Sequence, residues 1–134
     1  MTRTFATLVT LSALYRAIAP ADAAEDIAGK YCGTAWSGGE LVEVVTTLST
    51  GPNGLLVGSY EFADKGVTTP GTLREYLKQN EDKRTLVWVD KYGTGQLVVT
   101  FDQSRDSFSG GWNVYIDPPT YRWDGQRCNL VASS

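Results

Sequence analysis

Histidine is absent from this 134-residue chain, and cysteine occurs only twice. Without histidine the chain lacks the commonest general base and the commonest metal ligand, and a Ser-His-Asp triad is excluded. The sequence also shows no dense acidic calcium loop, and its one Gly-x-Gly segment, residues 93–95, lies in a predicted hairpin turn with no helix after it. We therefore expect no metal site, no cofactor and no catalytic residue of these kinds.

Long apolar runs are missing as well. The longest, residues 5–15, is shorter than the roughly 20 residues needed to span a bilayer. It follows the basic residue Arg3 and precedes the small-residue segment Ala21-Asp22-Ala23, the order found in secretory signal peptides. The sequence predicts a signal peptide over residues 1–23, a single domain over 24–134, no membrane span, and a periplasmic or secreted location.

Clustered basic residues are also lacking. The net charge is −3, and the lysines and arginines are scattered, apart from Lys83-Arg84. A nucleic-acid partner is not expected, because a phosphate-binding face needs grouped positive charge. The two cysteines, Cys32 and Cys128, lie near opposite ends of the predicted exported domain, and an even count in an exported chain predicts one disulfide between them.

The chain after residue 27 contains short β-branched and aromatic runs separated by Gly, Pro, Asn and Asp. These runs predict eight strands, at residues 31–36, 41–49, 55–62, 71–78, 84–91, 96–102, 107–116 and 121–130, with a loop over 63–69. Short connections favour pairing of sequential neighbours, and a meander removes its edges by closing. We expect an all-β fold, a small antiparallel up-and-down barrel whose first and last strands are joined by the disulfide. A two-sheet sandwich is the alternative.

The predicted domain contains all four tryptophans and six of the seven tyrosines of the chain, which is many for a domain of this size. Most can be explained as core, since small barrels bury large aromatics. Some can instead line a pocket at the barrel mouth, with a few polar groups to orient a ligand. The residues chosen as candidate ligand-binding positions are Tyr60, Trp88, Trp112, Asn113, Arg122 and Trp123.

Three segments carry a resemblance to known barrels: Gly-Thr-Ala-Trp at 33–36, Leu-Val-Glu-Val at 41–44, and Asn-Gly-Leu-Leu-Val-Gly-Ser-Tyr at 53–60. Together they resemble the opening strands of avidin-like barrels, and the Gly-x-x-Trp is similar to the start of lipocalins. The resemblance covers about a quarter of the chain and implies an eight-stranded ligand-binding barrel, with Ser59 and Tyr60 at pocket positions. The later strands do not match those that line a biotin pocket, so the ligand stays open.

Three functions are consistent with the sequence. The favoured one is an exported binding module for a small apolar or aromatic ligand. The second is a protein-interaction module, such as an enzyme inhibitor, that uses loop 117–121 or 63–70. The third is a carboxylate-dependent isomerase or cyclase. Its acid or base would be one of the carboxylates in or beside the strands, namely Glu61, Glu75, Asp90 or Asp124. Whether the barrel has a cavity and whether the chain forms oligomers stay open.

Overall fold

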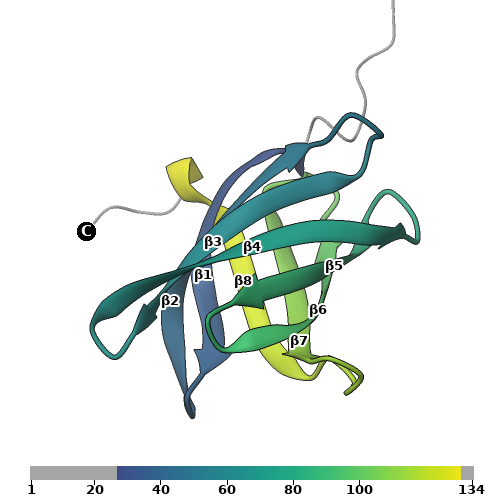
Figure 1. The fold of residues 1–134 in the computed structure, drawn as a ribbon. Coiled ribbons are helices and arrows are strands. Elements are labelled where there is room, and N and C mark those ends of the chain that lie inside the picture. The colour runs from purple at the N-terminus through teal and green to yellow at the C-terminus, as the bar shows by residue number, and fades with distance from the viewer. Residues whose placement is uncertain (1–26, 131–134) are drawn as a thin grey trace, which may run out of the picture.

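The computed structural model describes residues 27–130, which form a closed barrel of eight antiparallel strands (Figure 1). Each strand pairs with its neighbours in chain order, and the last pairs with the first. The predicted all-β up-and-down barrel is confirmed, whereas the predicted signal peptide lies outside the described residues. The strands are β1 (Gly29–Ser37), β2 (Glu40–Thr50), β3 (Leu56–Asp64), β4 (Val67–Lys78), β5 (Lys83–Asp90), β6 (Gly93–Phe101), β7 (Ser107–Val114) and β8 (Tyr121–Arg127).

Side chains along the strands alternate between the barrel interior and solvent. In β3, Leu56, Tyr60 and Phe62 are buried, whereas the residues at 57, 59 and 61 are exposed. The same period of two places Leu97 and Phe101 of β6 inside. This alternation fills the interior with large apolar and aromatic side chains.

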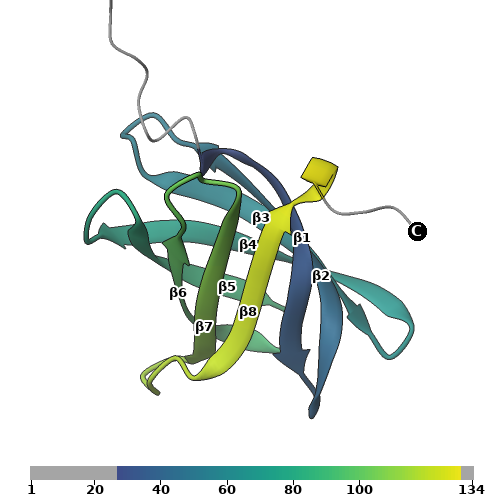
Figure 2. The same cartoon turned by 180° about the vertical axis from the view of Figure 1, so that it is seen from behind.

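The barrel closes where β1 meets β8. Their register runs from Tyr31 opposite Arg127 to Ala35 opposite Trp123, and Figure 2 shows β8 lying between β7 and β1. Close to this seam, Cys32 and Cys128 form the predicted disulfide, with their Cα atoms 4.9 Å apart. Cys128 begins the 3-10 helix η1 (Cys128–Leu130), so the bond joins β1 to the segment that directly follows β8.

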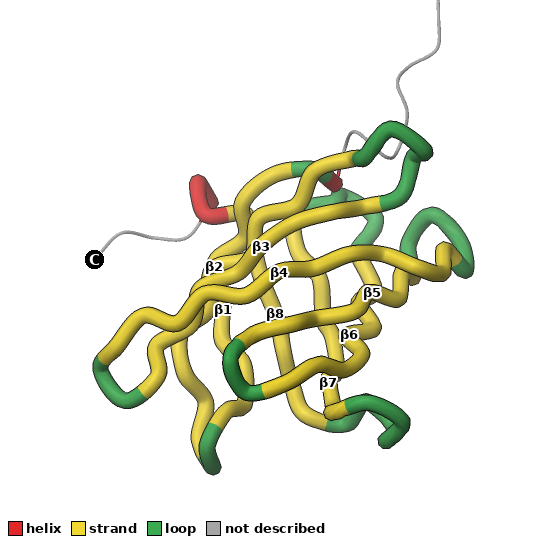
Figure 3. The backbone as a smooth tube through the Cα atoms, viewed as in Figure 1, coloured by secondary structure: helices red, strands yellow, loops and turns green. Residues whose placement is uncertain are grey.

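Several predicted boundaries were wrong. The sixth strand begins at Gly93 and not at 96, so residues 93–95, predicted as part of a hairpin turn, belong to β6. The expected loop at 63–69 is the end of β3, a tight turn and the start of β4. Both Lys65 and Gly66, which form the turn, have positive φ (53° and 84°), as the two central residues of a type I′ hairpin require. The seventh strand ends at Val114 and not at 116, and the eighth ends at Arg127, before η1 (Figure 3).

Aromatic side chains fill one end of the barrel, where the β2–β3, β4–β5 and β6–β7 turns lie. The rings of Tyr31, Phe101 and Phe108 form a mutual cluster with centroid separations of 5.8, 5.3 and 5.6 Å. The Tyr31 hydroxyl donates to the Ile27 carbonyl at 2.8 Å, which ties the segment before β1 to this cluster. The rings and the Ile27 side chain are buried, so they close this end to solvent.

A buried ion pair lies at the same end. Arg84 on β5 donates from Nε to Oε2 of Glu75 on β4 at 2.7 Å, and from Nη2 to Oε1 at 3.2 Å. The backbone N–H of Leu56 donates to Oε1 at 2.8 Å. Both charged side chains are 0% exposed, which is tolerated because each charge is paired and hydrogen-bonded. No helix among residues 27–130 is long and apolar enough to cross a membrane.

Candidate functional site

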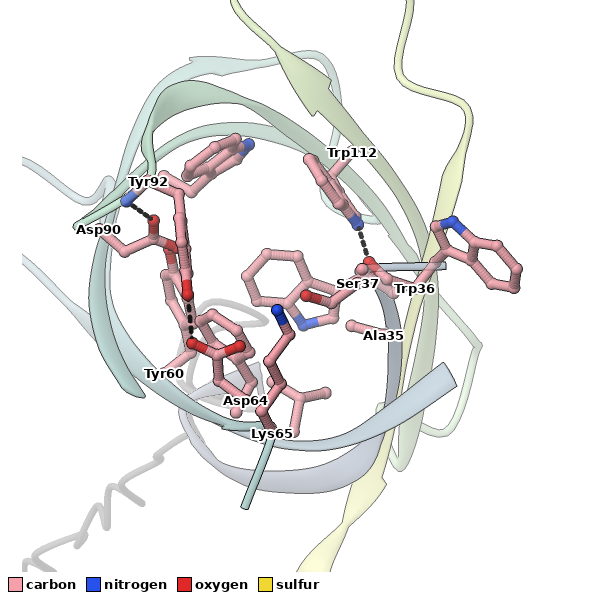
Figure 4. Close-up of a pocket in the computed structure, with 14 residues that line it drawn as sticks. Ala35, Trp36, Ser37, Tyr60, Asp64, Lys65, Asp90, Tyr92 and Trp112 are labelled. Carbon is pink, nitrogen blue, oxygen red and sulfur yellow. Dashed lines mark hydrogen bonds between the residues drawn. The ribbon is translucent and has the colours of Figure 1, made fainter. Parts of the chain in front are cut away.

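The opposite end of the barrel holds a cavity of about 280 Å³ (Figure 4). It lies at the end where the β1–β2, β3–β4 and β5–β6 turns are found, and β1, β2, β3, β5, β7 and β8 all contribute side chains. Its inner walls come from strand residues that alternation points inward. Its rim comes from residues beside the turns: Trp36, Ser37, Gly38, Asp64, Lys65, Asp90 and Tyr92.

Four aromatic side chains form most of the inner wall. Trp88 and Trp112 meet edge to face, with their centroids 5.4 Å apart and their planes at 89°. Tyr60 and Trp123 also meet edge to face, at 4.7 Å and 72°. Such pairs contribute about 0.5–1.5 kcal/mol beyond area burial, so they hold the rings in defined orientations. The cavity is therefore a preformed aromatic chamber.

Hydrogen bonds to the protein hold the three inward tryptophans. The Trp88 indole N–H donates to the Asn113 carbonyl at 3.1 Å, and the Trp112 N–H donates to the Trp36 carbonyl at 3.1 Å. The Trp123 N–H donates to the hydroxyl of Thr46, a buried residue of β2, at 3.0 Å. Each indole has one N–H, so these rings present only apolar and π surface to the cavity.

Tyr60 is joined to Asp90 across the wall. Its hydroxyl donates to Asp90 Oδ2 at 2.7 Å, and Asp90 Oδ1 accepts the backbone N–H of Tyr92 at 2.8 Å. Burial, aided by the hydrogen bond to Asp90 and by its charge, raises the pKa of Tyr60 well above its usual value of 10. The phenol therefore keeps its proton at neutral pH.

A second phenol–carboxylate pair lies at the rim. The Tyr92 hydroxyl donates to Asp64 Oδ2, which also accepts from the Thr69 hydroxyl at 3.2 Å and lies 3.8 Å from Lys91 Nζ. The Tyr92 hydrogen bond lowers the pKa of Asp64, and the same bond raises the pKa of Tyr92. Asp64 is therefore a carboxylate at neutral pH and a weaker base than an ordinary aspartate.

Gly71 makes room for the Tyr60 ring. It faces the interior of β4 and pairs with Tyr60 in the β3–β4 register. A Cβ at this position would collide with the phenol carbons and oxygen of Tyr60. The absence of a side chain therefore lets the Tyr60 ring lie against β4 and reach Asp90.

Four of the six candidate ligand-binding residues line the cavity together: Tyr60, Trp88, Trp112 and Trp123. Asn113 and Arg122 are not among the lining residues. The Asn113 amide donates to the Pro118 carbonyl at 2.8 Å and so braces the β7–β8 connection. The Arg122 guanidinium pairs with Asp124 at 2.8 Å, with two thirds of its side chain exposed.

The resemblance also implied pocket positions at residues 59 and 60. Ser59 is exposed on the outer face of β3, one position from the inward Tyr60. Alternation along the strand separates such neighbours, and it also explains why Asn113 and Arg122, which follow Trp112 and precede Trp123, point away from the interior.

The four candidate carboxylates have separate environments. Asp90 lines the cavity, and Glu75 is enclosed at the filled end with Arg84. Glu61 is exposed, and Asp124 pairs with Arg122 outside the lining. The sequence reasoning missed Asp64, Lys65 and Tyr92 at the rim, along with Ala35, Val44 and Phe62 of the inner wall.

Much of the missed inner wall could have been found from the alternation of inward and outward side chains along each strand. Phe62 and Asp64 continue the inward set that contains Tyr60, but Asp64 falls in the predicted 63–69 loop. Within residues 27–130 no group of three or more His, Cys, Asp or Glu side chains is placed to hold a metal ion.

These features define a class: a closed eight-stranded barrel, filled at one end and hollowed into an aromatic chamber at the other. Comparison with known proteins found no match to any protein-family model, curated protein or solved structure. The chamber offers a ligand flat apolar surfaces, two phenol–carboxylate pairs and one lysine at the rim.

Proposed function

We propose that this protein is a binding module that takes a small apolar or aromatic molecule into the open end of its barrel. The observation that carries the proposal is the chamber of about 280 Å³ walled by Tyr60, Trp88, Trp112 and Trp123. Ligand pockets are concave and mostly apolar, with a few polar groups, and commonly measure roughly 300–1,000 Å³. A cavity slightly below that range suits a ligand of one or two rings.

The fold class adds support. An eight-stranded up-and-down barrel can enclose a single small ligand, as the lipocalins do, and avidin-like and lipocalin-like barrels are the ones that the opening strands resemble. The disulfide is a bond typical of oxidising compartments, so we propose that the module works in the periplasm or outside the cell.

The other two functions have less support. An interaction module needs no cavity, whereas this barrel has a chamber, and one of its two proposed contact loops, 63–70, is largely strand. An isomerase or cyclase would use a carboxylate in the chamber as a base. Both chamber carboxylates already accept a phenol hydroxyl, Asp90 from Tyr60 and Asp64 from Tyr92. The bond from Tyr92 lowers the pKa of Asp64 and makes that residue a weaker base.

Tryptophan fluorescence of the oxidised protein tests the proposal. The protein is titrated with phenol, 2-naphthol, 1-octanol and glucose, and the same titrations are repeated with Ala35→Leu. Ala35 is buried on β1 and lines the chamber, so a leucine there projects into the space that the ligand would occupy. We expect a saturable change with the aromatic probes in the wild type and its loss in the variant.

Ala63→Leu is the matched control, because it adds the same atoms on the exposed face of β3. It should bind as the wild type does. A flat response to every probe, or equal binding by Ala35→Leu and the wild type, would contradict the proposal. Attention would then move to protein partners of the β7–β8 connection.

A further inference from the structure

The donors on the chamber's aromatic walls are already engaged within the protein. Each inward indole N–H donates to a protein oxygen, and the hydroxyls of Tyr60 and Tyr92 donate to Asp90 and Asp64. A hydroxyl or an indole nitrogen has a single hydrogen to give. These walls therefore offer a ligand π faces, phenol lone pairs and carboxylate oxygens. None of those groups can donate to a ligand.

Few donors remain among the lining side chains. The Trp36 ring points away from the chamber in Figure 4, which leaves the Ser37 hydroxyl and the Lys65 ammonium, both at the rim. Lys65 lies on the exposed β3–β4 turn, and in this view its side chain extends over the mouth. A ligand rich in acceptors would find little to bind deeper in the chamber.

The charge of the lining also favours a cationic ligand. Asp64 and Asp90 contribute two negative charges, and Lys65 contributes one positive charge. Lys91 approaches Asp64 from outside the lining, at 3.8 Å, with 60% of its side chain exposed, so solvent screens its effect. Aromatic faces attract cations through their quadrupoles, most strongly where water is excluded, and this attraction adds to that of the carboxylates.

We propose that the ligand of the chamber is an organic cation, a protonated or quaternary amine on an apolar or aromatic body. This inference rests on the proposed binding function and specifies its ligand class. The body packs between the Trp88–Trp112 pair and Tyr60, and the ammonium lies toward the Asp64 and Asp90 carboxylates at the rim. The pKa of Asp64 is lowered, so that carboxylate keeps its charge at neutral pH.

Three probes of matched size test the inference at pH 7: 3-phenylpropylamine, 3-phenyl-1-propanol and 3-phenylpropionate. They differ in the charge and hydrogen bonding of one end group. Calorimetric titration should give at least about tenfold tighter binding for the amine than for the alcohol, since a desolvated cation–π contact alone is worth roughly that factor. The propionate should bind more weakly than the alcohol.

Charge variants provide the second readout. Asp90→Asn and Asp64→Asn should each weaken binding of the amine several-fold and leave binding of the alcohol unchanged. Two variants are used so that the test survives if one of them fails to fold. Lys65→Asn should tighten binding of the amine, because it removes a like charge. Asparagine tolerates the left-handed backbone at this position. Lys30→Asn, with the same charge change at an exposed site near the filled end, is the control.

The outcomes separate the two proposals. An alcohol that binds as tightly as the amine would overturn the cationic ligand and leave the binding function standing. A propionate that binds most tightly, and loses affinity in Lys65→Asn, would assign the chamber to anions. If none of the three probes binds, both proposals are wrong.

Discussion

The Arg84–Glu75 pair allows a sharp test of how the filled end is stabilised. Both side chains are 0% exposed, and the guanidinium makes two hydrogen bonds to the carboxylate, at 2.7 and 3.2 Å. Arg84→Met keeps an unbranched side chain of similar reach but leaves the carboxylate only the hydrogen bond from the Leu56 N–H. The variant thus creates a buried charge without a counter-charge.

We expect Arg84→Met to lower the free energy of unfolding by about 3–5 kcal/mol, the usual cost of removing one partner from a buried pair. For a domain of this size, about 3 kcal/mol corresponds to a fall in Tm of roughly 12–24 °C. The measurement is urea unfolding of the oxidised protein at pH 7, followed by tryptophan fluorescence.

The double variant Glu75→Gln/Arg84→Met completes the test. It removes both charges, and the amide oxygen of the introduced glutamine can still accept from the Leu56 N–H, so its loss should be smaller than that of Arg84→Met alone. Arg84→Met with a loss below about 1 kcal/mol, or a double variant less stable than the single one, would refute the reasoning. Either result would mean that water or a rearranged side chain reaches the carboxylate.

Other variants probe the seam and the chamber. Replacing Cys32 and Cys128 by alanine should lower stability by about 4–5 kcal/mol in the chain-entropy model for a loop of this length, and equal urea midpoints with and without the bond would contradict it. Gly71→Ala should cost about 1–3 kcal/mol in urea unfolding, because the Tyr60 ring must move; an unchanged midpoint would show that it does not. The raised pKa of Tyr60 stabilises the fold fully below pH 10, and this contribution is lost as pH rises through the folded-state value, so stability should fall above pH 10. Tyr60→Phe should flatten that fall, and an identical slope in both proteins would count against the assignment.

The number of strands and the closure of the barrel could be predicted because β-branched and aromatic runs, and the turn residues between them, are local signals. The β3–β4 hairpin could not be predicted, because Pro70 lies among the first residues of β4 and a proline argues against a strand. In the structure Pro70 pairs only with Glu61 on β3, one residue before the pairing of β4 with β5 begins at Gly71. β4 is therefore locally an edge there, where a missing N–H costs little.

The candidate site could also be predicted only in part from the sequence. Large aromatics on inward positions could be recognised from sequence, and Trp112 and Trp123 line the chamber. Their neighbours Asn113 and Arg122 are polar and so resemble groups that orient a ligand, but alternation along the strand points them outward. Tyr92 lies in the β5–β6 turn, and only the folding of the strands into a barrel brings its hydroxyl to Asp64, 28 residues earlier in the chain.

The disulfide also makes the chain between Cys32 and Cys128 a covalent ring that passes through all eight strands. A protease that cuts once within this ring, for example in the exposed segment 115–118, opens the ring without releasing a fragment. The nicked molecule would keep every strand in one covalent piece, with new ends beside the chamber. The ring therefore offers a natural position for new termini, so that a circularly permuted barrel could carry a fused reporter at its mouth.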